Sequence, residues 1–221
     1  MSVFEDSYNT ISIMQPYFFP YPGYFELPAQ ADLFILFDDV QFPRRGWVHR
    51  NKFHMKDSQE TDWWGLPLIK SPQATTLISD LRFDVERIAE FQNKFDRFEV
   101  SKMRQSVKEL FPSLFELTDR TVLGYLGDQI RDVCAYLEIN TKIIKSSDIP
   151  NSEHVSGENR IIQICKALGA KSYLNASGGV GLYSPEKFLK NGIELKFLPT
   201  YAGNTESILE QIVLNKLKLD Y

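Results

Sequence analysis

Two short apolar runs near the N-terminus constrain the fold of this chain more than any other feature. Residues 11–14 form a run that is too short for a helix and rich in isoleucine, which is typical of a buried strand. Residues 33–37 form a second such run, and residues 24–31 between them have room for two helical turns. Two buried strands that bracket a helix indicate a βαβ unit with parallel strands. We therefore expect an α/β fold with a mainly parallel central sheet.

The rest of the chain continues this alternation, with apolar residues at helical or strand spacing. We expect helices at 84–111, 119–137, 156–168, 184–191 and 206–217, strands at 63–69, 77–83, 141–145, 171–175 and 193–198, and a charged loop at 42–56. Ser156 and Ser184 are predicted N-caps. The order favours helices on both faces of the sheet, as in Rossmann-like or HUP-like folds. We predict one domain over residues 11–221 after a disordered lead-in at 1–10, with 84–117 as a helical insert or lid.

Charge and cysteine usage exclude several classes of protein. The net charge of −4 supplies no general polycation, so we expect no DNA partner. We see no apolar run near the roughly 18 residues that span a bilayer and no hydrophobic signal core, so we expect a cytoplasmic protein without a transmembrane segment. Cys134 and Cys165 fall on apolar helix faces and are predicted to be buried thiols, as in a reducing cytosol. No Cys/His spacing indicates a metal site.

Polar residues follow both N-terminal strands. Gln15 ends the first strand, and Asp38, Asp39 and Gln41 follow the second. Ligands of open parallel sheets bind beyond the carboxyl ends of the strands, so we predict Gln15 and Gln41 as binding residues. Successive strand residues point to opposite faces, so one aspartate should face the ligand. Asp38 and Asp39 are candidate general bases toward an amino group; the alternative is a polar strand end without a catalytic role.

The turn between the first strand and its helix is unusually aromatic. Tyr17, Tyr21, Gly23 and Tyr24 are candidate binding residues, because tyrosines stack on bases and sugars and a helix start favours phosphate. The alternative is an aromatic mini-core. The order of strand, turn, helix and strand also vaguely looks like the adenylyl-transferring HxGH proteins, but Tyr21 and Tyr24 stand where that motif has its two imidazoles.

A cluster of five cationic or imidazole groups follows at residues 44–52, in a chain that is net acidic. Arginine suits bidentate contact with phosphate. His49 is a candidate general base, because an ordinary imidazole titrates near neutral pH, whereas His54 and His154 have no supporting neighbours in the sequence. A solvated surface is the alternative for the cluster. The predicted phosphate- and substrate-binding residues here are Arg44, Arg45, Trp47, Arg50, Asn51 and Lys52.

A glycine-rich turn follows the predicted strand at 171–175 and precedes a predicted helix. It should therefore lie on the same carboxyl edge as the first strands, and its glycines let backbone approach a ligand closely. Asn175 and Ser177 are candidates to bind hydroxyls or phosphate, together with Gly178 and Gly179. The alternative is an ordinary turn between a strand and a helix.

Two blocks carry a resemblance to a known family. The stretch QPYFFPYPGYFELPAQADLFILFDDVQF with RRGWVHRNK, and the later YLNASGGVGLY, resemble the WbqC-like family of bacterial proteins. The resemblance runs from about residue 11 to the C-terminal region. It implies a role in building surface polysaccharide, often O-antigen, as a transferase that acylates or aminoacylates a nucleotide-linked amino sugar. A dTDP- or UDP-amino sugar is then the expected acceptor, and an acyl-CoA, an acyl carrier or a charged tRNA is the expected donor.

Three hypotheses follow. The first is this transferase, with the segments 15–24, 38–52 and 173–183 forming one site. The second is an ATP-dependent enzyme that activates an acid and releases pyrophosphate. The third is a non-catalytic nucleotide-sugar-binding or scaffold protein. The sequence leaves open which sugar and which donor are used. It also leaves open whether the protein is a monomer or a homodimer.

Overall fold

The structure is a computed structural model that describes residues 8–69, 75–151 and 154–217. The chain forms two compact units. The sheet unit contains Met1–Gln15, Gly23–Val40 and Glu138–Gly203, and the hairpin unit contains Pro16–Pro22, Gln41–Leu137 and Asn204–Tyr221. The expectation of a single domain stays a prediction.

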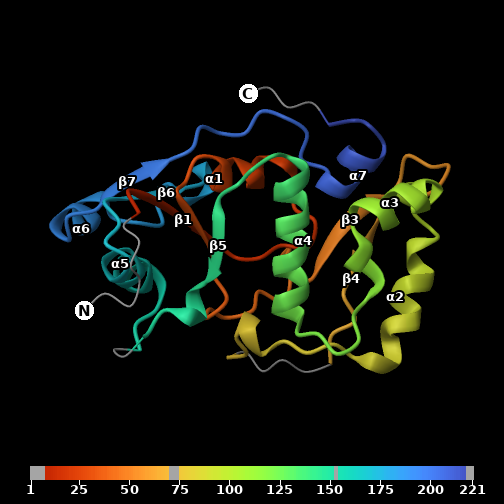
Figure 1. Cartoon of the computed structure of the whole chain (residues 1–221), viewed down its shortest axis with the longest axis horizontal. Coiled ribbons are helices and arrows are strands. Elements are labelled where there is room, and N and C mark those ends of the chain that lie inside the picture. Colours follow the sequence, from red (N-terminus) through yellow and green to blue (C-terminus); the bar gives the residue numbers. More distant parts are fainter. Residues whose placement is uncertain (1–7, 70–74, 152–153, 218–221) are drawn as a thin grey trace. The chain divides into compact units, whose positions relative to one another are not determined.

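A five-stranded parallel sheet forms the centre of the sheet unit (Figure 1). The strand order is β5-β2-β1-β6-β7, so the two N-terminal strands pair with each other as predicted, with Ile11 opposite Leu33. The sequence-based prediction of an α/β fold with a parallel sheet is therefore confirmed. The strands are β1 (Thr10–Met14), β2 (Leu33–Leu36), β5 (Lys142–Lys145), β6 (Ser172–Asn175) and β7 (Glu194–Phe197).

Helices cover both faces of this sheet. Alternate strand residues face opposite sides, so each strand presents side chains to both layers of helices. Ile11 and Ile13 join a buried cluster with Ile161 of α5, whereas the Ser12 hydroxyl donates a hydrogen bond to the Leu27 carbonyl of α1 at 3.2 Å. The helical segments of this unit are η1 (Pro22–Phe25), α1 (Glu26–Ala29), η6 (Ser146–Asp148), α5 (Gly157–Ala167), η7 (Ser177–Gly179) and α6 (Pro185–Lys190).

Serine and glycine mark the ends of α5 and α6. Ser156 and Ser184 occupy the predicted N-cap positions, although neither side chain makes a capping hydrogen bond. Gly169 and Gly192 follow the two helices with φ of +65° and +74°, the left-handed conformation that glycine adopts without a steric penalty. The predictions that Gly169 and Gly192 end these two helices are therefore correct.

The hairpin unit is built on two antiparallel strands, β3 (Arg50–His54) and β4 (Thr61–Gly65). Trp64 is fully buried, stacks on Phe91 with ring centroids 4.6 Å apart, and contacts Phe18 and Phe53 edge-on. This aromatic cluster is the core of the unit. The helical segments are η2 (Ile78–Asp80), η3 (Val85–Arg87), α2 (Ile88–Phe95), η4 (Glu99–Met103), α3 (Arg104–Leu110), η5 (Pro112–Phe115), α4 (Val122–Tyr136) and α7 (Ile208–Val213).

The longest helix, α4, follows the sequence-based prediction closely. The Thr121 hydroxyl caps its N-terminus by accepting from the Gly124 N–H at 3.0 Å. Its apolar stripe is buried as predicted, at Leu123, Leu126, Ile130, Val133, Cys134 and Leu137.

Several boundary predictions are wrong for local reasons. The strand at 63–69 ends at Gly65, since Pro67 has no N–H for a ladder, and 77–83 forms a 3-10 turn with isolated bridges at its ends. The second half of the charged loop at 42–56 is strand β3. The helix predicted over 84–111 starts as a 3-10 turn, which leaves Val85 66% exposed. It is not continuous, because the chain divides there into α2, η4 and α3.

The chain ends also differ from the predictions. The last helix stops at Val213, before Asn215 with φ of +52°. Within the predicted lead-in, Thr10 belongs to β1, and the N–H groups of Asn9 and Thr10 donate to the Asp32 carboxylate at 3.0 and 2.8 Å. Residues 1–7 of the lead-in lie outside the described residues.

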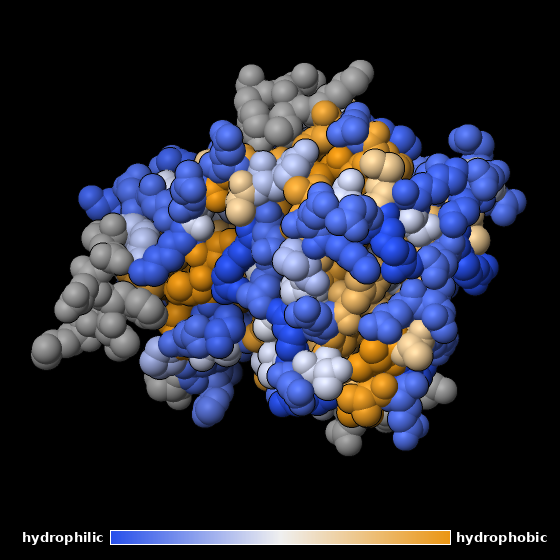
Figure 2. Space-filling model, turned by 45° about the vertical axis from the view of Figure 1, so that its right-hand side comes forward, coloured by the Kyte–Doolittle hydropathy of each residue, from blue (hydrophilic) through white to orange (hydrophobic). Residues whose placement is uncertain are grey.

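The surface view in Figure 2 shows a mostly hydrophilic face with apolar areas between the polar side chains. In the part of the chain that the structure describes, no helix has both the length and the apolar character needed to cross a bilayer.

Candidate functional site

The predicted site residues fall into two groups. Nine of them belong to the sheet unit: Gln15, Gly23, Tyr24, Asp38, Asp39, Asn175, Ser177, Gly178 and Gly179. Ten belong to the hairpin unit: Tyr17, Tyr21, Gln41, Arg44, Arg45, Trp47, His49, Arg50, Asn51 and Lys52. The expectation that both groups form one site stays a prediction.

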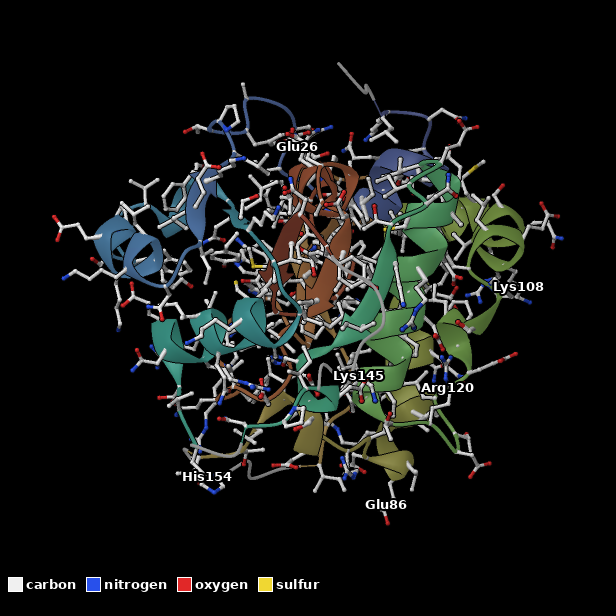
Figure 3. All side chains as sticks on the ribbon, turned by 60° about the vertical axis from the view of Figure 1, so that its left-hand side comes forward. Glu26, Glu86, Lys108, Arg120, Lys145 and His154 are labelled. Atoms are coloured by element: carbon white, nitrogen blue, oxygen red, sulfur yellow. The ribbon has the colours of Figure 1, made fainter. Side chains whose placement is uncertain are left out.

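In the sheet unit, the parallel register brings the strand ends to one edge. Met14 pairs with Leu36, and Leu36 pairs with Lys145, so Gln15, Asp38 and the start of η6 follow neighbouring strands. Figure 3 shows Lys145 at this edge and Glu26 of α1 at the opposite end. The predicted edge therefore exists in this unit.

Asp38 and Asp39 bind the chain itself at this edge. Asp38 is fully buried, and its Oδ1 accepts from the Ser146 hydroxyl at 2.9 Å and the Ser147 N–H at 3.0 Å. Asp39 accepts from the Arg160 guanidinium at 2.8 Å. Arg160, only 1% exposed, also donates to the carbonyls of residues 146, 149 and 150. The two aspartates thus fix the loop after β5, while the buried Asp38 Oδ2 has no partner among the described residues.

The aromatic turn and the glycine turn of the sheet unit also have internal roles. The Tyr24 hydroxyl donates to the Gln15 carbonyl at 2.9 Å, and Gly23 lies buried in η1. Asn175 is buried and accepts from the Ala176 N–H at 2.9 Å, and a Cβ at Gly179 would meet the Asn175 amide nitrogen at 2.1 Å. Ser177 and Gly178 remain accessible beside it. Since α1 has only four residues, its dipole offers little to an anion.

The hairpin unit contains a cavity of about 470 Å³. Among the described residues, four cationic side chains line it against one carboxylate, that of Glu90, and tryptophan and phenylalanine rings complete its wall. The cationic and aromatic lining residues are Arg44, Arg50, Arg87, Lys94, Phe42, Trp63, Trp64 and Phe91, with His49 between them. A cavity of this size suits a ligand of nucleotide dimensions.

Cation–π contacts organise one wall of the cavity. The Arg50 guanidinium lies 4.2 Å from the centroid of the Trp63 ring, and the Lys52 ammonium lies 5.4 Å from it. Trp47, 44% exposed, approaches Trp63 with centroids 5.3 Å apart. The Nε of Arg50 is buried without a partner among the described residues, so this guanidinium retains donor capacity for a ligand.

Two other cations of the cavity already have acidic partners. The Arg87 Nε donates to Glu90 at 3.0 Å, and Lys94 pairs with Asp62 at 3.1 Å. Both are partly exposed, so they can share their donors with an anion that enters the cavity.

His49 is a neutral imidazole in the wall of this cavity. Burial and the positive charge of Arg50 lower its pKa from 6.5 to about 4. Its Nδ1 is buried and has no partner among the described residues, and its ring packs edge-on against Phe42 at 5.1 Å. Neutral at pH 7, the ring has one nitrogen able to accept a proton.

The other predicted residues of the hairpin unit lie in varied environments. Tyr17 is half-buried, and burial together with the neighbouring Tyr21 raises its pKa. Gln41 and Arg45 are exposed. Asn51 is buried and donates to the carbonyls of residues 18 and 19, which is a structural role.

Sequence reasoning missed Trp63, Arg87 and Lys94 as cavity residues. Trp63 and Trp64 are adjacent on β4 and both line the cavity, although Trp64 is fully buried in the core. Arg87 and Lys94 are seven residues apart, two helical turns, which places them on one face. The tryptophan pair and this spacing were the available signals.

A second group of titratable side chains contradicts the expectation for His54. Its ring nitrogens face Glu210 at 3.2 Å and Glu206 at 3.5 Å. Among the described residues, this is the group that could hold a metal ion. The partners are more than 150 residues away in sequence, so neighbouring residues gave no signal.

Comparisons with known proteins give one family and one relative. The model of the WbqC-like protein family matches residues 15–205. A protein of Mycobacterium tuberculosis named "Uncharacterized protein Rv1507c" is 26% identical over 169 residues, which cover 75% of this chain and 71% of that protein. No solved structure matches significantly.

Proposed function

Because the chain belongs to the WbqC-like protein family, we propose that it is a transferase of bacterial surface-polysaccharide (O-antigen) biosynthesis. It acylates or aminoacylates the amino group of a nucleotide-linked amino sugar. The observation that carries this proposal is the cavity where Arg44, Arg50, Arg87 and Lys94 meet the ring of Trp63. Nucleotide sugars of this kind are soluble, so we place the reaction in the cytoplasm.

The cavity chemistry fits the diphosphate of such a substrate. Arginine guanidinium groups form bidentate hydrogen bonds with phosphate oxygens, and a surplus of cations over carboxylates favours a multiply charged anion. Trp63 presents an aromatic face that a base or a sugar ring can pack against. Trp47 and Lys52 extend this surface beyond the cavity.

His49 is the group that we assign as general base. The amine of the sugar attacks the carbonyl carbon of an acyl thioester or aminoacyl ester, a C–N bond forms, and the C–S or C–O bond breaks. The nitrogen loses a proton, and a neutral imidazole can accept it. Burial is the larger cause of the lowered pKa of His49, and bound diphosphate would offset the smaller one, the repulsion by Arg50, and so raise this pKa from about 4. Asp38 and Asp39 then act as positioning residues of the sheet edge.

A ligand panel in a thermal melt tests this proposal. Binding at 100 times Kd should stabilise the fold by about 2.7 kcal/mol. A shift with a dTDP- or UDP-amino sugar supports the transferase, and mass spectrometry of that sugar after incubation with acyl-CoA or charged tRNA should show the added acyl group. A shift restricted to ATP with Mg²⁺, with release of pyrophosphate, contradicts it in favour of an acid-activating enzyme. No shift with any ligand favours a scaffold protein.

A further inference from the structure

His54, Glu206 and Glu210 converge at the end of β3 and the beginning of α7. The His54 Nδ1 lies 3.2 Å from Glu210 Oε2, and its Nε2 lies 3.5 Å from Glu206 Oε1. One ligand atom from each of the three side chains lies within 4.8 Å of the others. The two short distances involve different ring nitrogens, so one ion can use only one of them. Adjacent ligand atoms of a tetrahedral site with bonds of about 2.0–2.1 Å are separated by about 3.3 Å, so a rotation of a glutamate side chain has to bring the second carboxylate to the same nitrogen.

The Glu210 carboxylate is buried without a permanent cation. It is 1% exposed, so its charged form has lost most of its hydration. Its hydrogen bonds come from the His54 backbone N–H at 2.8 Å and the His54 ring. Among the described residues, no lysine or arginine forms an ion pair with Glu206 or Glu210. A buried carboxylate of this kind is normally paired or bound to a metal.

An acidic hollow gives access to these side chains. It has a volume of about 360 Å³, and His54 and Glu206 line it together with Asp57, Glu99, Lys102 and Lys216, so three carboxylates face two lysines. Among the described residues, Lys216 forms no ion pair with either glutamate. Lys102 is already engaged by Asp57 at 2.7 Å and Glu99 at 2.8 Å, so it does not neutralise the glutamates beside His54. The hollow has room for water molecules that would complete a coordination shell.

We propose that His54, Glu206 and Glu210 bind a divalent transition-metal ion such as Zn²⁺. One imidazole nitrogen and one oxygen from each carboxylate are ligands that Zn²⁺ takes in proteins. The ion would replace the proton between the imidazole and the carboxylates, and it would join β3 to the C-terminal helix α7. The site is separate from the cavity lined by Trp63, so it stands independently of the proposed transferase activity.

The full chain, stripped of metal with a chelator, tests this by calorimetric titration with ZnCl₂. We expect one Zn²⁺ per chain, a higher melting temperature on loading, and weaker binding as the pH falls, since the imidazole must be deprotonated. Glu206→Gln and His54→Asn should each weaken binding by about tenfold or more. Glu99→Gln, in the same hollow but outside the three ligands, is the matched control and should bind as the wild type does.

No Zn²⁺ binding by the wild-type chain, or equal binding by Glu206→Gln and His54→Asn, would overturn the site. The side chains would then be held by hydrogen bonds between the imidazole and the two carboxylates, and chelator would leave the melting temperature unchanged. Circular dichroism checks the fold of the variants. If they fail to fold, the Co²⁺ absorption spectrum of the wild type decides, because missing d–d bands of a nitrogen- and oxygen-ligated ion would exclude the proposal.

Discussion

Asn51 holds a strained turn, and its replacement should destabilise the hairpin unit. Phe19 has φ of +42°, a conformation that costs a bulky residue about 1–3 kcal/mol and needs surrounding contacts to persist. Its N–H donates to Gln129 at 2.9 Å, and its carbonyl accepts from Asn51 at 2.6 Å and from Ser207 at 3.0 Å. Asn51 also donates to the Phe18 carbonyl at 3.3 Å.

The expected loss for Asn51→Ala follows from these bonds. Two hydrogen bonds contribute about 0.5–1.5 kcal/mol each, and a buried carbonyl left without a donor adds about 1–3 kcal/mol. We therefore expect the free energy of unfolding to fall by about 2–6 kcal/mol, measured by urea denaturation at constant slope. Asn51→Asp should be at least as harmful, because it places a carboxylate against two carbonyl oxygens.

Lys52→Ala is the matched control for this prediction. Lys52 is the next residue on β3 and is exposed, so its removal should change the free energy of unfolding by about 0.5 kcal/mol or less. If Asn51→Ala were no more destabilising than Lys52→Ala, the inference that side-chain hydrogen bonds hold Phe19 in its turn would be wrong.

Other predictions concern the cavity, the thiols and the sheet edge. Arg50→Ala should weaken binding of a nucleoside diphosphate by about tenfold or more in calorimetry, because a charged hydrogen bond contributes about 1.5–3 kcal/mol; an unchanged Kd would refute its role. Since burial and Arg50 lower the pKa of folded His49 to about 4, the unfolded chain binds the proton first as the pH falls, and stability is lost from about pH 6.5 downward. His49→Gln should therefore lose less stability than the wild type between pH 7 and pH 4.5, by urea midpoints. Burial raises the pKa of Cys134 and Cys165 to about 12, so a thiol reagent should label neither until urea unfolds the chain; labelling of the native chain would contradict this. Arg160→Met should destabilise by about 3–5 kcal/mol in the same denaturation assay, because it removes the cation beside Asp39 and the donor to three carbonyls; a loss below 1 kcal/mol would mean that the loop after β5 does not depend on Arg160.

The parallel sheet was predictable because its strands are continuous apolar runs. Ile11, Ile13, Leu33 and Ile35 are fully or nearly fully buried, and runs of this kind leave few alternatives to a sheet covered on both faces. The hairpin unit was harder to predict. Its strand β3 alternates between buried Asn51 and Phe53 and exposed Lys52. The buried position 51 is polar, so the sequence does not show the alternation of apolar and polar residues that predicts a strand.

The chemistry of the candidate site was predictable from the sequence. The tertiary contacts of its residues were harder to predict. The composition of residues 44–50 indicated phosphate binding, and three of these residues line the cavity. The tertiary contacts that decide the role of Asp39 and His54, with Arg160 and Glu210, join residues more than 100 positions apart. Pattern and spacing describe local structure, so they carry no information about such pairs.

Calorimetric titration of the wild-type chain with dTDP or UDP, beside the matching uncharged nucleoside, tests the cavity as a nucleotide-sugar site most directly. We predict binding of the diphosphate, at most weak binding of the nucleoside, and loss of affinity for the diphosphate in Arg50→Ala but not in Arg45→Ala, whose side chain is exposed and does not line the cavity. Equal affinities for diphosphate and nucleoside, or an Arg50→Ala variant that binds dTDP and UDP as the wild type does, would contradict the assignment.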